Sequence, residues 1–279
     1  MRLAVLGAGA VGSSVAELAG DYGHTVTALA DSRSAVLDPE GIDVGSALDR
    51  KEREGVVGDA DPEEALAGTY DVLVEATPTT LGDAQPGFGH LRAALERDRH
   101  VVFANKGPVA ERYADVRALE RESGGTVLME ATVGGAMGYE HVLAEAQDLG
   151  VAEADPSFDV EGTDAALKCT ILANVLAEGG REYTLEDATV EGIKSLPGSA
   201  LELANEDGRT IRLIGEVSDG EVRVGPRLVP AYGALAVTGT RNIVQLETEH
   251  AGQLNVSGRG AGGPETATAV LADVDRLDS

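Results

Sequence analysis

Residues 2–12 read RLAVLGAGAVG, and this stretch decides the fold. Its first five residues are apolar enough for a buried strand, and a Gly-x-Gly-x-x-Gly run follows at once. The sequence then predicts a helix over about 13–22 and a second strand over 25–30, which ends at Asp31. The order strand, glycine turn, helix, strand, acid is typical of a dinucleotide-binding βαβ unit.

Each glycine of the turn has a separate task in such a unit. Gly7 permits the tight turn, Gly9 lets the backbone approach a pyrophosphate, and Gly12 lets helix and strand pack closely. Ala10 and Val11 then open the helix, whose first N–H groups face the phosphates. The turn therefore predicts the phosphate site of a dinucleotide; the alternative is a glycine-rich turn without a ligand.

The choice of dinucleotide depends on the end of the second strand. Asp31 suits the 2′-hydroxyl of an adenosine ribose and therefore NAD. Arg33, with Lys51 nearby, could instead hold the 2′-phosphate of NADP. Arg33 could equally be an ordinary surface arginine. The pattern favours use of both cofactors.

The same alternation continues to about residue 137. Further strands are expected at 71–76, 100–104 and 126–129, with helices over 87–97 and 108–121 between them. Repeated strand–helix–strand units with short links predict an α/β fold with a Rossmann-type parallel sheet.

The second half of the chain has a different pattern, which predicts a smaller α+β domain. Two helices are followed by turn-bounded strands that suggest a mostly antiparallel sheet, and a last helix is expected to return to the first domain. The predicted domains are 1–137 with 258–279, and 138–257. The expected elements are helices at 139–149, 164–177 and 264–277, and strands at 210–217, 221–224, 234–237, 242–248 and 253–256.

The composition is strongly acidic. Asp and Glu number 48 against 22 Lys and Arg, which gives a net charge of −26 and disfavours a nucleic acid or an anionic membrane as partner. Lysine is rare, and the acid is spread along the chain, as expected for a cytoplasmic protein of a salt-adapted organism. The single cysteine excludes an internal disulfide. No apolar run is long enough to span a membrane, and the opening strand leaves no room for a signal peptide.

Residues 153–168 read EADPSFDVEGTDAALK and place a rare lysine behind several carboxylates. Asp164 and Lys168 are four residues apart and share one face of a helix. With Glu153 and Asp159 they could line a pocket that holds an amino acid by its ammonium while the lysine moves a proton elsewhere. The alternative is a solvated acidic loop before a helix with one ion pair.

Several motifs together resemble the homoserine dehydrogenase family. They are the glycine turn, ANKGP at 104–108, EATVGGAM at 130–137, the stretch 153–168, and GRGAGG at 258–263. The resemblance runs in order along nearly the whole chain. It implies interconversion of L-homoserine and L-aspartate 4-semialdehyde with NAD or NADP, in threonine and methionine biosynthesis.

The resemblance also implies roles for individual residues. Lys168 corresponds to the proton donor and acceptor at the substrate oxygen, with Asp159 supporting it. Glu153 and Asp164 correspond to ligands of the substrate's amino end, and Lys106 to a contact near nicotinamide and substrate.

Two further sites follow from the same resemblance. Thr77 and Gly262 correspond to cofactor contacts. A sodium site is implied by the Glu130 carboxylate and by the backbone carbonyls of Val133, Gly135 and Met137. The alternative for Glu130 is a plain carboxylate at the end of a strand.

The chain departs from the family pattern after Met137, where a segment of a few dozen residues is absent. In the family this segment forms part of the substrate pocket and of the subunit interface. It could be missing from the sequence as given, deleted with loss of activity, or absent because the chain is a shortened paralogue. Two rival functions follow: a dinucleotide-binding protein without catalysis, and a dehydrogenase of another small amino acid. The family resemblance implies a homodimer or higher homo-oligomer, and no appended regulatory domain is expected.

Overall fold

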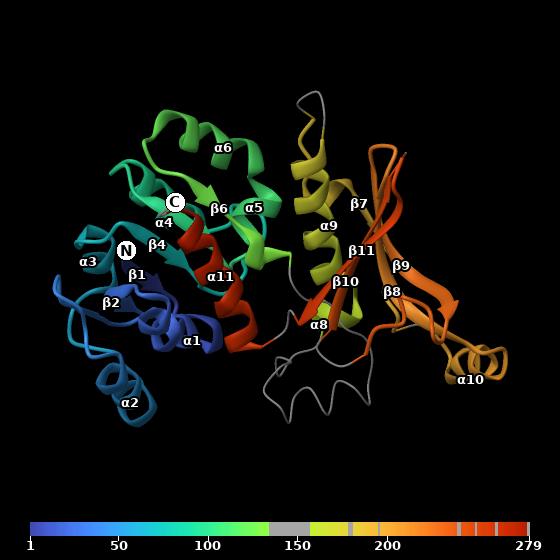
Figure 1. Cartoon of the computed structure of the whole chain (residues 1–279), viewed down its shortest axis with the longest axis horizontal. Helices are drawn as coiled ribbons and strands as arrows, with labels where there is room; N and C mark the ends of the chain where they lie inside the picture. Colours follow the sequence, from blue (N-terminus) through green and yellow to red (C-terminus); the bar gives the residue numbers. More distant parts are fainter. Residues whose placement is uncertain are drawn as a thin grey trace. The chain divides into compact units, whose positions relative to one another are not determined.

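The computed structural model describes residues 1–133, 157–177, 181–194, 196–238, 241–248, 250–259 and 262–277. The described residues divide between two compact units, shown in Figure 1. The first is Met1–Val133 with Gly263–Ser279, and the second is Gly134–Gly262. The sequence had placed the two boundaries at 137 and 258. Each unit is described separately below.

The first unit contains a six-stranded sheet in the order β3-β2-β1-β4-β5-β6. All neighbouring strands run parallel except β3, an antiparallel edge strand that pairs with β2. The order reverses between β1 and β4, which is where open α/β sheets bind ligands. The predicted Rossmann-type sheet is confirmed. Its strands are β1 (Arg2–Leu6), β2 (Thr25–Ala30), β3 (Ala35–Leu37), β4 (Val72–Glu75), β5 (His100–Phe103) and β6 (Val127–Leu128).

Helices cover both faces of this sheet. α1 (Ala10–Leu18), followed by the 3₁₀ turn η1 (Ala19–Tyr22), packs with α11 (Gly263–Leu277). α3 (Pro62–Ala67) contacts β1, β2 and β3, and α4 (Gly87–Leu95) contacts β4 and β5. The remaining helices of this unit are α2 (Val44–Glu54), α5 (Gly107–Glu111), α6 (Tyr113–Glu122) and the 3₁₀ turn η2 (Glu130–Thr132).

The C-terminal helix α11 completes the core of the first unit. Its Ala267, Val270, Leu271 and Val274 are fully buried and join the same apolar cluster as strand residues of β1 and β4. Burying a side chain of this size contributes about 1.5–3 kcal/mol, so α11 is an integral part of this fold. The helix predicted over 264–277 therefore returns to the first unit.

In the described part of the second unit, a long helix packs on a small sheet. α9 (Thr163–Leu176) packs on the three-stranded sheet β7-β9-β8 through small side chains such as Ala165, Ala166 and Cys169. The elements of this unit are α8 (Ser157–Val160), α9, η3 (Leu185–Asp187), β7 (Ala188–Val190), α10 (Gly198–Glu206), β8 (Arg209–Ser218), β9 (Glu221–Pro230), β10 (Arg241–Thr248) and β11 (Gly252–Arg259).

Two expectations for the second unit were wrong. Residues 234–237 form no strand, because the chain turns there after β9. The strands form two sheets, since β10 and β11 make a separate antiparallel ribbon and β7 joins β9 in parallel. The helix predicted over 139–149 lies outside the described residues.

Candidate active site

Gly7 and Gly12 are glycines because the fold requires them. Gly7 has a φ of +102°, and a Cβ atom there would collide with the carbonyl of Ala76 and lie 2.7 Å from the Thr77 nitrogen. A Cβ atom on Gly12 would collide with the carbonyl oxygen of Gly7. The turn is therefore packed tightly between the ends of β1 and β4.

Gly9 has no such requirement from the protein. Its backbone is extended, with φ −90° and ψ −165°, and a Cβ atom there would meet nothing within 4 Å. Gly9 is the N-cap of α1 and no side chain caps this helix, so the first N–H groups, at Ala10 and Val11, are open to a ligand. A glycine that the fold leaves open fits the close approach of a phosphate.

The other end of the chain meets this helix. A Cβ atom on Gly263 would lie 2.6 Å from the Ala10 carbonyl oxygen and 2.6 Å from the Ser14 hydroxyl. The start of α11 therefore lies against the start of α1. Gly262, the predicted late cofactor contact, comes directly before it with a φ of +114°.

Asp31, Arg33 and Lys51 come together at the end of β2. One Asp31 oxygen accepts the N–H groups of Arg33 at 2.8 Å and Ser34 at 2.9 Å, and the other accepts the Lys51 ammonium at 2.8 Å. The Arg33 guanidinium donates to the carbonyl of Gly55, the last residue of the turn that ends α2. Partial burial raises the pKa of Asp31, but these hydrogen bonds outweigh it and lower that pKa.

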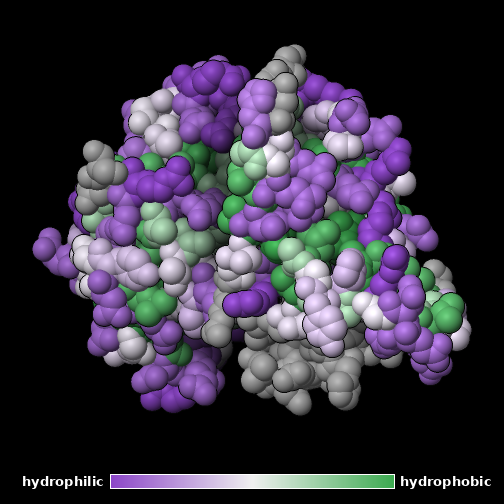
Figure 2. All heavy atoms as spheres, turned by 45° about the vertical axis from the view of Figure 1, so that its right-hand side comes forward, coloured by the Kyte–Doolittle hydropathy of each residue, from purple (hydrophilic) through white to green (hydrophobic). Residues whose placement is uncertain are grey.

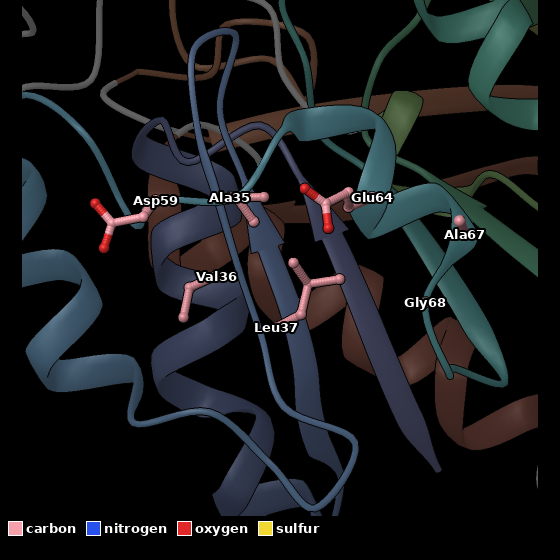
Figure 3. A pocket seen from close by; sticks show the side chains of 8 residues that line it. Ala35, Val36, Leu37, Asp59, Glu64, Ala67 and Gly68 are labelled. Atoms are coloured by element: carbon pink, nitrogen blue, oxygen red, sulfur yellow. The ribbon is translucent and has the colours of Figure 1, made fainter.

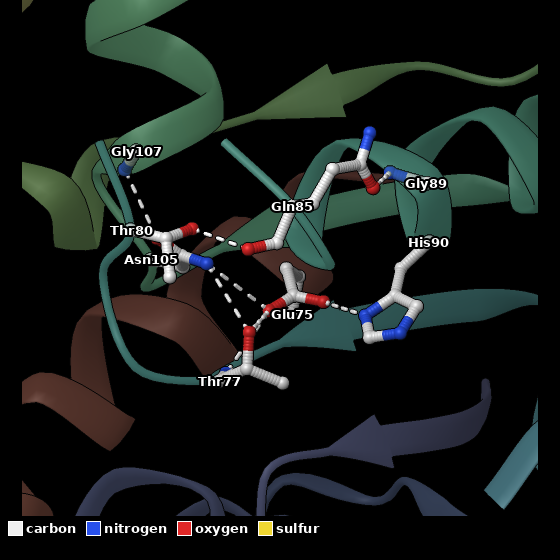
Figure 4. A network of polar contacts seen from close by, with 8 residues as sticks. All are labelled: Glu75, Thr77, Thr80, Gln85, Gly89, His90, Asn105 and Gly107. Carbon is white, nitrogen blue, oxygen red and sulfur yellow. Dashed lines mark hydrogen bonds and ion pairs between the residues drawn. The ribbon is translucent and has the colours of Figure 1, made fainter. Parts of the chain in front are cut away.

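Thr77 and Lys106 follow the ends of β4 and β5. They flank a polar cluster, drawn in Figure 4, in which Glu75 and Asn105 are buried and His90 is partly exposed. Sequence reasoning missed this cluster. The available signal was Glu75 itself, a carboxylate at the end of an otherwise apolar strand.

The lysine of the acidic motif lies on α9 in the second unit. The Lys168 side chain is 9% exposed and donates to Asp164, which is 18% exposed and one turn earlier. Asp159 lies on α8, a short helix that packs against α9. The structure therefore brings Asp164 and Lys168 into contact, while Glu153 lies outside the described residues.

Among the described residues, the predicted sodium ligands do not form a complete coordination site. The Glu130 carboxylate is 60% exposed, with the Arg276 guanidinium 3.5 Å away, and a guanidinium competes with a cation. Val133 is the C-cap of the 3₁₀ turn that begins at Glu130, while Gly135 and Met137 lie outside the described residues. The sodium ion stays a prediction, and no catalytic step below uses it.

Two other features are not candidates for a reactive or binding site. Burial raises the pKa of Cys169 to about 11, which keeps this thiol protonated and unreactive. A hollow of about 490 Å³ beside β3, shown in Figure 3, contains none of the predicted site residues. Its two carboxylates are already used, because Asp59 pairs with Arg50 and Glu64 belongs to the capping box of α3.

Comparison with protein families gives two matches. A model described as homoserine dehydrogenase matches residues 123–274. A second model, described as glutamate/leucine/phenylalanine/valine dehydrogenase, matches residues 1–79, which span the glycine turn and the strands beside it.

Curated proteins of the same kind are similar over most of the chain. A homoserine dehydrogenase of Methanocaldococcus jannaschii is 34% identical, over 98% of this chain and 97% of the relative. An NAD⁺-dependent homoserine dehydrogenase of Pseudomonas canavaninivorans is 35% identical, over 73% of this chain and 70% of the relative. The first alignment runs over 330 positions, more than the 279 residues of this chain, so that relative has residues with no counterpart here. The position of the gap after Met137 stays a prediction.

Solved structures show the same fold. The crystal structure of a protein assigned as a homoserine dehydrogenase from Archaeoglobus fulgidus superposes with a TM-score of 0.84 at 35% identity, covering 99% of each chain. A homoserine dehydrogenase from Thiobacillus denitrificans gives a TM-score of 0.75 at 28% identity, over 98% of this chain and 72% of the other.

Proposed function

The chain belongs to the homoserine dehydrogenase family, and from this premise we propose that it interconverts L-homoserine and L-aspartate 4-semialdehyde with a nicotinamide cofactor. One observation carries the proposal beyond the family match. A dinucleotide turn with an open central glycine stands in the first unit, and a buried lysine paired with a carboxylate stands in the second.

Lys168 is proposed to donate and accept the proton of the substrate hydroxyl. When bound, the nicotinamide exchanges a hydride with the carbinol carbon of the substrate. In the direction of reduction, the Lys168 ammonium gives a proton to the oxygen of the aldehyde as that oxygen gains charge. In the direction of oxidation, the neutral amine removes the hydroxyl proton. Asp164 accepts a hydrogen bond from the ammonium and so orients it.

Two opposing effects act on the Lys168 ammonium. A carboxylate at hydrogen-bond distance stabilises an ammonium, whereas burial of the side chain opposes it. The ammonium is the form needed to reduce the aldehyde, and the neutral amine is the form needed to oxidise the alcohol. The substrate's own ammonium is proposed to bind the carboxylates of Asp164 and Glu153, with Asp159 supporting Lys168.

The cofactor is proposed to lie along the C-terminal ends of β1, β2 and β4. Gly9, Ala10 and Val11 would hold its pyrophosphate, and Thr77, Lys106 and Gly262 would lie toward the nicotinamide. The Lys51 ammonium lies beside Asp31, and the Arg33 guanidinium is bonded to Gly55 at the end of α2, the helix that carries Lys51; these two cations support use of NADP as well as NAD.

Self-association is proposed as well. Large apolar side chains are exposed on the second unit, and Figure 2 shows hydrophobic surface there. A homodimer would remove such side chains from water. They include Phe158, Val175, Leu176, Val190, Leu203, Leu228, Tyr232, Leu246, Leu254 and Val256.

A cytoplasmic site in a salt-adapted organism is proposed on the charge of the chain. With a net charge of −26, the negative side chains of the folded protein repel one another unless salt screens their charges. The described residues include no helix that is long and apolar enough to cross a membrane.

The proposed activity is tested by the appearance of NADH or NADPH on addition of L-homoserine, measured in concentrated KCl. Turnover of homoserine supports the proposal. Cofactor binding without turnover of any amino alcohol would instead favour a non-catalytic dinucleotide-binding protein, and turnover of another amino alcohol alone would favour the other rival.

A further inference from the structure

A fully buried carboxylate lies at the C-terminal end of β4, and the proposed proton transfer does not use it. The Glu75 side chain is 0% exposed. One of its oxygens accepts the Thr77 backbone N–H at 3.0 Å and also the Thr77 hydroxyl. Its other oxygen lies 2.6 Å from Nδ1 of His90, on α4 (Figure 4).

Asn105 extends this cluster to the end of β5. Its side-chain nitrogen donates to Glu75 at 3.3 Å and to the Thr77 hydroxyl oxygen at 3.2 Å. Its side-chain oxygen accepts the Gly107 backbone N–H at 2.9 Å. The cluster therefore joins the residues after β4 to the turn that carries Lys106.

The hydrogen bonds determine what the Thr77 hydroxyl can offer to a ligand. A hydroxyl has one hydrogen and two lone pairs. The Thr77 hydroxyl donates its hydrogen to Glu75. One of its lone pairs accepts the Asn105 side-chain N–H. Thr77 is only partly buried, so its remaining lone pair can accept one hydrogen bond from a ligand.

Thr77 also lies beside the dinucleotide turn. Its backbone nitrogen would be 2.7 Å from a Cβ atom on Gly7, the first glycine of that turn. The acceptor therefore stands at the ends of β1 and β4, where the strand order of the sheet reverses. Ligands of open α/β sheets bind at this place.

We propose that Glu75 and His90 are positioning residues that fix the Thr77 hydroxyl as an acceptor for the carboxamide NH₂ of a bound nicotinamide. This inference rests on the proposed function, since it needs a nicotinamide cofactor. His90 secures the far oxygen of Glu75, and Glu75 in turn orients Thr77. Stability alone is a poor reason for such a polar cluster, because well-packed apolar side chains often stabilise a core equally well.

The inference is tested by comparing two probes, NAD⁺ and ADP-ribose, in isothermal titration calorimetry of the whole protein. ADP-ribose lacks the nicotinamide, so it reports on the rest of the site. We expect Glu75→Gln, His90→Asn and Thr77→Val each to weaken NAD⁺ binding by about 2- to 10-fold, the effect of one hydrogen bond. ADP-ribose affinity should stay unchanged in all three.

Two further variants separate positioning from folding. Thr77→Ser keeps the hydroxyl and should retain NAD⁺ affinity. The double variant Glu75→Gln/Thr77→Val should bind NAD⁺ as Thr77→Val does, because Glu75 acts through Thr77. His24→Asn is a control, since His24 comes before the start of β2 whereas Glu75 is the last residue of the parallel strand β4, so the two residues lie at opposite ends of the strands. It should leave both affinities unchanged.

Three outcomes would overturn the inference. Equal losses for NAD⁺ and ADP-ribose would assign the cluster to folding alone. If Thr77→Val leaves the NAD⁺ affinity unchanged, the Thr77 hydroxyl is not an acceptor for the nicotinamide. This variant tests the inference even if Glu75→Gln does not fold. Failure of the unsubstituted protein to bind either probe would overturn the proposed function together with the inference.

Discussion

The Lys168 ammonium donates a hydrogen bond to the Asp164 carboxylate one turn earlier on α9, and both side chains are largely buried. The helix holds both residues at a spacing that the sequence alone determines. Proton transfer by a side chain requires a fixed donor at the reacting atom, and a paired, buried lysine supplies one.

Lys168→Ala is expected to lower kcat for homoserine oxidation by about 100- to 10,000-fold, the usual contribution of a general acid or base. The dissociation constant of NAD⁺ should change little, because the residue acts on the substrate oxygen. Steady-state kinetics with calorimetric cofactor titration measures both. Lys194→Ala is the control, because Lys194 is an exposed lysine paired with Glu161 in the same unit. A large loss of cofactor affinity in Lys168→Ala would contradict the role.

Gly9→Val is expected to abolish nucleotide binding and leave the fold intact. A Cβ atom there would meet nothing within 4 Å, and the new side chain would fill the space where we place the pyrophosphate. Gly12→Val should instead unfold the first unit, because its Cβ atom collides with backbone. Circular dichroism and cofactor titration distinguish the two. Gly20→Val, at another open glycine outside the turn, should keep both fold and binding; nucleotide binding by Gly9→Val would refute the pyrophosphate site.

Lys51→Met is expected to weaken NADP⁺ binding more than NAD⁺ binding, by about 10-fold for the loss of one charged hydrogen bond to the 2′-phosphate. It should also move acid unfolding to higher pH. The pKa of Asp31 is lowered in the fold, so this group stabilises the protein above its unfolded pKa, and the benefit is lost as pH falls. Without Lys51 the pKa of Asp31 is lowered less, so Asp31 contributes less to stability. Equal losses for the two cofactors would argue against a phosphate contact.

Asp273→Asn is expected to leave the free energy of unfolding at pH 7 unchanged or slightly higher. Burial and the neighbouring Glu130 carboxylate raise the pKa of Asp273, although Arg276 opposes them. Ionisation of a group with a raised pKa costs stability as pH rises, and asparagine avoids this while its oxygen still accepts the Glu130 N–H, now bonded at 2.8 Å. Asp273→Ala leaves that N–H unpaired and should cost about 1–3 kcal/mol. Urea unfolding at pH 7 and toward pH 4 measures the free energy of unfolding of each variant relative to the unsubstituted protein. Any gain from Asp273→Asn should shrink in acid. A loss of stability as large for Asp273→Asn as for Asp273→Ala would contradict the argument.

Potassium chloride is expected to stabilise the protein strongly between low salt and about 1 M, where the Debye length falls to about 3 Å. The reason is screening of a net charge of −26. Thermal unfolding at a series of KCl concentrations measures the effect, and the uncharged osmolyte sucrose is the control. A melting temperature that rises with sucrose but is flat in KCl would remove the charge argument.

The sequence predicts the first unit well because its signals are local. Apolar strands such as 2–6, the glycine turn and the acid at position 31 each show their role within a few residues. The helices α2 and α3 were not predicted, because both are short and mostly polar; in α2 only Val44, Ala47 and Leu48 pack toward the core. Asp43 and Asp61 cap the two helices and could have indicated their starts.

The parts that the sequence did not predict depend on contacts between distant residues. Nothing local shows that Glu75 would meet His90, fifteen residues later, or Asn105, which follows the end of the next strand along the sheet. Similarly, the separation of β10 and β11 from β8 and β9 is a matter of pairing, since the alternating pattern of each strand fits either arrangement.

The first unit is built from both ends of the polypeptide, with α11 supplying buried side chains to the sheet that the opening residues begin. A ribosome makes those opening strands well before α11. Until that helix leaves the exit tunnel, the sheet has an apolar face open to water and the dinucleotide turn lacks the Gly263 backbone that packs against it. Native folding of this unit therefore waits for α11, and a nascent chain should gain affinity for nucleotide only once that helix has left the ribosome.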